Sequence, residues 1–106
     1  MNKDRIKQLL NFLKETPNDP FLLYALATEY KEEVPEKSKQ LFDQLLKEHP
    51  NYIGTYYHAA ALYADHFDRE RAEVIYKLGI QKAQELQEAH ALRELQNAYT
   101  NFQFED

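Results

Sequence analysis

The chain has 106 residues, of which 43% are hydrophobic and 29% charged, and its formal net charge is −5. This length suits one compact domain and is short for two. The absence of cysteine excludes disulfides and cysteine-ligated metal clusters. The acidic balance, without any basic block, predicts that the partner is neither a nucleic acid nor a membrane surface.

No apolar run in the chain reaches the length of a signal peptide or a membrane span. The sequence therefore predicts a cytoplasmic protein. Only two glycines and four prolines interrupt a chain that is rich in helix-forming residues, and this composition favours an all-α fold.

In the first half of the chain, apolar side chains recur at the three- and four-residue spacing of a helix. This pattern predicts a first helix over residues 3–15, which ends before Pro17. Asp19 is suited to cap a second helix with Pro20 in its first position, and a third helix is expected to end at His49 and Pro50. The apolar residues of these helices are Ile6, Leu9, Leu10 and Leu13; Leu23, Leu26, Ala27 and Tyr30; and Leu41, Phe42, Leu45 and Leu46.

The second half of the chain predicts three further helices by the same spacing. Asn51 is a candidate N-cap for the fourth helix, and residues 65–68 are expected to form the turn into the fifth. Gln87 and Glu88 are expected to form the turn before the last helix. The apolar residues are Tyr56, Ala59, Ala60 and Tyr63; Ala72, Val74, Ile75, Tyr76, Leu78 and Gly79; and Leu92, Leu95 and Tyr99.

The two halves of the chain repeat each other. A shift of 33 residues superposes residues 17–18 on 50–51 and the apolar residues of the second helix on those of the fourth. Beyond the turn that follows the second helix, a shift of 34 residues superposes the third helix on the fifth. A connection that is one residue shorter in the first unit explains the change. Repetition of helix pairs favours stacked pairs over a simple bundle.

The repeat resembles the tetratricopeptide repeat family, whose unit is a helix–turn–helix of about 34 residues. The resemblance implies an all-α fold of about six helices, with antiparallel pairs stacked as a short right-handed α-α superhelix. It implies a single domain, 1–106, with an N-terminal helix (3–15), repeat 1 (20–50), repeat 2 (53–85) and a C-terminal capping helix (88–103). Gly79 is expected to admit the next helix against its backbone, and Tyr63 and Tyr76 are expected to fill the space between neighbouring repeats.

In the resembled family, the first helix of each repeat lines a concave groove that holds an extended peptide or a partner helix. The resemblance therefore implies binding residues one step round the helices from the apolar stripes. Tyrosines offer rigid apolar area with a hydroxyl, and Arg93 can pair with a carboxylate. Tyr57 directly follows Tyr56 and can instead pack sideways as core. Tyr24 can likewise belong to the core rather than to the groove. The predicted partner-binding residues are Tyr24, Thr28, Lys31, Tyr57, His58, Ala61, Arg93 and Asn97.

One subgroup of the family grips the C-terminal carboxylate of chaperone tails with lysine, asparagine and arginine. Tyr24 and Thr28 occupy the places of the first lysine and the asparagine, so this ligand is disfavoured. An enzymatic function is also disfavoured, because none of the four histidines, His49, His58, His66 and His90, stands in a catalytic or metal-binding motif. The sequence predicts no catalytic residue, no metal and no cofactor.

Two functions follow from these observations. The first is a scaffold or adaptor that binds a protein or peptide. The alternative is a self-associating module that covers its end faces by homodimerisation, because two repeats are fewer than the three usually needed. Phe12, Phe102 and Phe104 favour association, whereas polar residues on the first and last helices favour the adaptor. Phe102 and Phe104 cannot share one helical face, so the last residues can fold back, dock on another molecule or fray.

Overall fold

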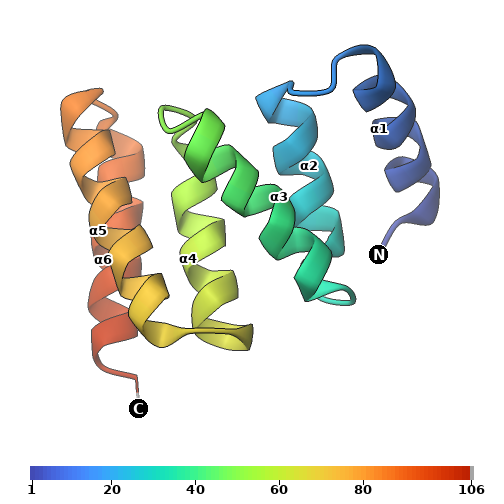
Figure 1. Cartoon of the computed structure of the whole chain (residues 1–106). Coiled ribbons are helices and arrows are strands. Elements are labelled where there is room, and N and C mark those ends of the chain that lie inside the picture. Colours follow the sequence, from blue (N-terminus) through green and yellow to red (C-terminus); the bar gives the residue numbers. More distant parts are fainter. Residues whose placement is uncertain (106) are drawn as a thin grey trace. The chain divides into compact units, whose positions relative to one another are not determined.

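The computed structural model describes residues 1–105, and this part of the chain forms six α-helices (Figure 1). The all-α fold class predicted from the sequence is therefore confirmed. The chain divides into two compact units, Met1–His49 and Pro50–Asp106, whereas the single domain over residues 1–106 stays a prediction. The helices are α1 (Lys3–Glu15), α2 (Pro20–Tyr30), α3 (Pro35–Glu48), α4 (Gly54–His66), α5 (Arg69–Glu85) and α6 (Ala89–Gln103).

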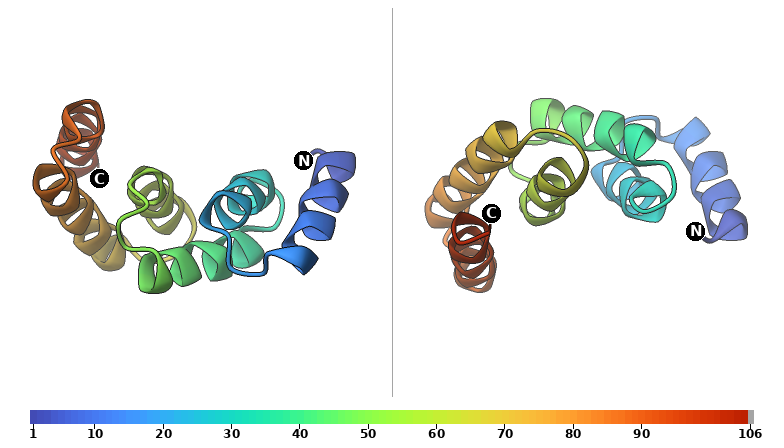
Figure 2. Two further views of the ribbon diagram at one scale, coloured as in Figure 1. Left: turned by 90° about the horizontal axis from the view of Figure 1, so that it is seen from above. Right: turned by 90° about the horizontal axis from the view of Figure 1, so that it is seen from below.

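In the unit Met1–His49, α2 packs against both α1 and α3, as both views of Figure 2 show. Asp19 caps α2 as predicted, because its side chain accepts a hydrogen bond from the Leu22 N–H at 3.1 Å. Since α2 has helices on two sides, it buries more than one stripe, and Ala25 is only 3% exposed although it lies outside the predicted stripe. The core residues from α1 and α2 on one side are Ile6, Leu9, Ala25 and Leu26.

A buried serine joins α2 to α3. Ser38 is fully buried, and its hydroxyl donates a 2.7 Å hydrogen bond to the Ala27 carbonyl. A small residue is needed there because the helices approach closely, and this bond satisfies the hydroxyl that burial removes from water. The connection before α2 is held in a similar way, since Asn18 Oδ1 accepts from Gln44 Nε2 at 3.0 Å and lies 3.1 Å from His49 Nε2.

In the unit Pro50–Asp106, α5 packs against both α4 and α6, and α4 also contacts α6. Figure 2 shows α4 and α6 beside α5. Gly79 of α5 lies at this junction, because a Cβ atom there would stand 2.6 Å from Tyr56 Cβ and 3.2 Å from Leu95 Cδ1. The prediction that Gly79 admits the next helix holds for α6 through Leu95, but the closest approach at Gly79 is to the preceding helix, α4.

Three details of the predicted boundaries and core were wrong. Asn51 does not cap α4: the N-cap is Ile53, without a side-chain hydrogen bond, because residues 51–53 form turns before the helix begins. Residues 65 and 66 belong to α4, and the connection to α5 is only Phe67 and Asp68. Val74 and Leu78 are 44% and 40% exposed, because the buried face of α5 is Ala72, Ile75, Tyr76, Gly79 and Ala83. Leu10 is likewise 42% exposed, because α1 buries Ile6 and Leu9.

The turn predicted at Gln87 and Glu88 is confirmed. Gln87 has a φ of 58°, in the left-handed region. The Glu88 N–H donates to the Ala83 carbonyl at 2.9 Å and the Gln87 N–H donates to the Gln84 carbonyl at 3.2 Å. This pair of bonds is the Schellman motif, which ends a helix and reverses the chain without a proline.

Phe102 and Phe104 have different surroundings. Phe102 is 7% exposed and lies in α6, where its ring centroid is 5.3 Å from that of Tyr76 and 4.2 Å from the Arg69 guanidinium carbon. Arg69 Nη2 also donates a 3.0 Å hydrogen bond to the Phe102 carbonyl. The expectation that Phe102 favours association is therefore wrong, because the chain itself covers this ring. Phe104 is 84% exposed.

Candidate partner-binding faces

The predicted binding residues lie on three helices. We name them the α2 face (Tyr24, Thr28 and Lys31), the α4 face (Tyr57, His58 and Ala61) and the α6 face (Arg93 and Asn97). Spacings of three or four residues join Tyr24, Thr28 and Lys31, join Arg93 and Asn97, and join Ala61 to both Tyr57 and His58, as the 3.6-residue period of the helix requires; Tyr57 and His58 are adjacent. Each face is therefore positioned by the apolar stripe that anchors its helix.

The α2 face is half-buried at all three predicted positions. The Thr28 hydroxyl donates to the Ala25 carbonyl at 2.9 Å, so its hydrogen is engaged within the helix and its oxygen can act as an acceptor. Phe21 belongs to the same face and is 55% exposed. The sequence interpretation missed Phe21, although its distances of three and seven residues from Tyr24 and Thr28 were a signal that could have found it.

The α4 face combines an exposed and a half-buried ring. Tyr57 is 42% exposed, whereas its neighbour Tyr56 is 3% exposed. The Tyr57 ring stands edge-on to that of His58, with centroids 5.3 Å apart and planes at 70°. Ala61 is half-buried one turn further along α4. Tyr56 is therefore part of the core, as its place in the apolar stripe predicted, and Tyr57, which the sequence left open between core and binding face, keeps an exposed part.

Burial and nearby groups raise the pKa of two tyrosines in the unit Pro50–Asp106, Tyr56 and Tyr76. Burial raises the pKa of Tyr76, and Tyr57, Glu105 and Asp65 act in the same direction. Burial also raises the pKa of Tyr56, with a further contribution from Glu85. These phenols are therefore neutral at physiological pH, and Tyr57 and Tyr76 lie near enough to influence each other.

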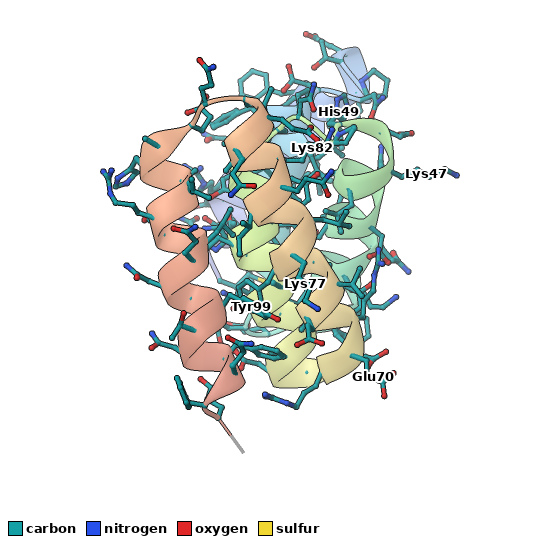
Figure 3. All side chains as sticks on the ribbon, turned by 90° about the vertical axis from the view of Figure 1, so that its left-hand side faces the viewer. Lys47, His49, Glu70, Lys77, Lys82 and Tyr99 are labelled. Carbon is teal, nitrogen blue, oxygen red and sulfur yellow. The ribbon has the colours of Figure 1, made fainter. Side chains whose placement is uncertain are left out.

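The α6 face is the most exposed of the three. Arg93 and Asn97 are one turn apart and both exposed, and each lies about 200° around α6 from the buried Leu95. The opposite side of α6 is anchored on α5, since Tyr99 lies beside Lys77 (Figure 3) and its hydroxyl donates to Glu73 Oε2 at 3.0 Å. Arg93 can therefore meet a partner without breaking a contact of the fold.

The described residues contain no group of three or more His, Cys, Asp or Glu placed to hold a metal ion. Within residues 1–105, no helix has the length and apolar character needed to cross a membrane. The candidate faces themselves offer aromatic, amide, hydroxyl and cationic side chains, which suit contacts with another protein.

Comparison with known proteins identifies the fold. The chain is 36% identical to the tetratricopeptide repeat domain protein from Salinibacter ruber, whose crystal structure superposes with a TM-score of 0.73. The match covers 83% of this chain and 99% of that chain. No protein-family model and no curated protein matches the sequence. With more than a third of the residues identical over nearly all of that domain, the chain belongs to the tetratricopeptide repeat family.

Proposed function

We propose that the chain is a scaffold that binds peptides or helices of partner proteins, through the α2 face in the unit Met1–His49 and through the α4 and α6 faces in the unit Pro50–Asp106. The fold of the tetratricopeptide repeat family generally mediates protein–protein interaction, and this relation favours a scaffold over an enzyme. The observation that carries the proposal is the exposure of Tyr57. Its ring is 42% exposed on a helix whose other tyrosines, Tyr56 and Tyr63, are 3% and 6% exposed.

The side chains of these faces define the chemistry of the partner. Phe21 and Tyr57 are exposed aromatic groups, which contribute large contact areas at low entropic cost. Lys31 and Arg93 are donors for carboxylates, and the guanidinium can bind a carboxylate through two hydrogen bonds. The partner segment is therefore expected to combine apolar side chains with carboxylates, and a short segment of this kind binds with roughly micromolar affinity.

Affinity capture with the Tyr57→Ala variant tests the proposal. We expect this variant to lose the proteins that the wild-type chain captures, because the anchor ring is removed. Its thermal unfolding temperature is expected to fall only modestly, since Tyr57 is 42% exposed and its neighbour Tyr56, not Tyr57, fills the core. Phe104→Ala is the matched control: it removes an aromatic ring that is 84% exposed outside the three faces. Equal capture by Tyr57→Ala and wild type would exclude the α4 face as the binding surface.

A second candidate function is self-association. It is supported by Phe12 on α1 and by Phe104, which are 59% and 84% exposed, since exposed aromatic groups are common in protein interfaces. Light scattering over a concentration series separates the candidates. A constant mass of one chain supports the monomeric scaffold, and a concentration-dependent dimer that Phe12→Ala or Phe104→Ala abolishes supports the homodimer.

A further inference from the structure

A shallow groove runs along α1, and none of its lining residues belongs to the candidate partner-binding faces. It has a volume of about 680 Å³ and extends from Lys3 to Pro17. Its floor includes Ile6, Leu10 and Leu13, and Leu10 is 42% exposed. We name this surface the α1 groove.

The apolar floor continues towards α3. A second hollow, of about 400 Å³, shares Leu10 and Leu13 with the α1 groove and is also lined by Leu26, Tyr30 and Leu41. Leu10 and Leu13 therefore present apolar surface on both sides, which a single bound helix could cover.

Lysines border the α1 groove without compensating carboxylates. Lys3, Lys7 and Lys14 are among its lining residues, and no acidic residue is. Within residues 1–105, none of these three lysines takes part in an ion pair. Lys3, Lys7, Leu10 and Lys14 follow one another at intervals of four, three and four residues and so form one stripe.

This charge pattern selects the occupant. The α1 helix carries four basic and two acidic residues, whereas the whole chain has a net charge of −5. Two copies of the chain that met through their α1 grooves would bring the lysines of both together, and like charges repel. A partner with carboxylates beside apolar residues would instead find complementary groups.

The backbone of α1 favours a helical occupant over an added strand. The N–H and C=O groups inside a helix are already paired with each other, so α1 offers no sheet edge to an extended peptide. A helical segment satisfies its own backbone. We propose that the α1 groove binds an acidic amphipathic helix of a partner protein, about as long as α1, with apolar residues against Leu10 and Leu13 and carboxylates against Lys3, Lys7 and Lys14.

A designed peptide tests this inference independently of the α2, α4 and α6 faces. The probe is a terminally blocked peptide of about 15 residues, roughly 22 Å as a helix, with leucines on one stripe and glutamates on both flanks. We expect saturable binding by fluorescence anisotropy, weakened by salt, with amide chemical-shift changes concentrated on α1. A scrambled peptide of the same composition should bind at least about tenfold more weakly, because it lacks an apolar stripe.

Charge reversal supplies the second arm. The Lys7→Glu/Lys14→Glu variant should bind the acidic peptide at least about tenfold more weakly. It should regain binding to a peptide in which lysines replace the glutamates, and this recovery would show that the variant is folded. The matched control is Lys47→Glu/Arg71→Glu, which makes the same charge change at two exposed positions outside the groove and should bind like the wild type.

Three results with the peptide would overturn the inference. They are the absence of saturable binding, equal weakening by both double variants, and chemical-shift changes confined to the unit Pro50–Asp106. A concentration-dependent mass that Leu10→Gln abolishes would also overturn it, because the groove would then belong to a second copy of the chain.

Discussion

Gly79 shows how a single residue sets the distance between helices. A Cβ atom at this position would lie 2.6 Å from Tyr56 Cβ and 2.9 Å from Tyr56 Cγ. Both atoms are close to the backbone of α4, so they cannot move aside as the end of a flexible chain can. Ser38 plays a comparable part between α2 and α3, where its hydroxyl is bound to the Ala27 carbonyl.

We expect Gly79→Ala to destabilise the fold by about 1–2 kcal/mol. Overpacking of a close contact costs about 1–3 kcal/mol, and the higher helix propensity of alanine offsets up to about 1 kcal/mol of this. Urea denaturation followed by circular dichroism measures the difference. A variant as stable as the wild type would show that α4 can shift away from α5 at little cost.

At the scale of the element, an aromatic cluster anchors the C-terminal end of α6, whose middle is anchored by the buried Leu95. The Phe102 ring centroid lies 5.3 Å from that of Tyr76 on α5 and 6.3 Å from that of Tyr99. The guanidinium of Arg69 covers the same ring and binds the carbonyl of Phe102. These contacts join the end of α6 to the beginning of α5, and they explain why a helix with a polar outer face stays packed on the unit.

The pair Phe102→Ala and Phe104→Ala tests this anchor. Phe102→Ala is expected to lower the free energy of unfolding by about 3 kcal/mol, because it removes a buried ring and leaves a cavity. Phe104→Ala is expected to change it by less than about 0.5 kcal/mol, since the ring is 84% exposed. Chemical denaturation of both variants measures the contrast, and equal effects would contradict the packing described for α6.

For the whole molecule, the buried tyrosines are expected to make the free energy of unfolding fall at alkaline pH. The pKa of Tyr56 and of Tyr76 is raised in the folded chain, first by burial and then by neighbouring charges. Below the ordinary value of about 10, both phenols are neutral in the folded and unfolded states, and their stabilising effect is fully present. As the pH rises through the folded pKa, the unfolded chain ionises first and this stability is lost.

We therefore expect the free energy of unfolding to fall as the pH rises above about 10, with each such tyrosine contributing about 1.4 kcal/mol per pH unit between its unfolded and folded pKa. Tyr76→Phe removes one contribution and should flatten the decline. Urea denaturation between pH 9 and 11 measures both slopes, and lysine titration cancels in the comparison. Parallel slopes for the two proteins would show that Tyr76 ionises equally easily in both states.

The identity of the helices could be predicted because it depends on local chemistry. Asp19 and Pro20 mark the start of α2, where Asp19 accepts a hydrogen bond from the nearby Leu22 N–H. The Gln87–Glu88 turn before α6 is likewise closed by hydrogen bonds to carbonyls three and five residues earlier in the chain. The boundary at Asn51 was missed, since residues 51–53 form turns that the spacing of apolar residues does not show. The repeat also predicted the close approach at Gly79, because only a small residue fits such a contact.

Spacing along the chain was enough to predict the all-α class, the six helices, the resemblance to the family and the small residue at Gly79. Which side chains are covered depends on the packing of one helix on another. Tyr57 is exposed beside the buried Tyr56, and Phe102 is buried while Phe104 is exposed. A helix period assigns each residue to a face but does not say which other helix covers that face, and burial depends on that neighbour.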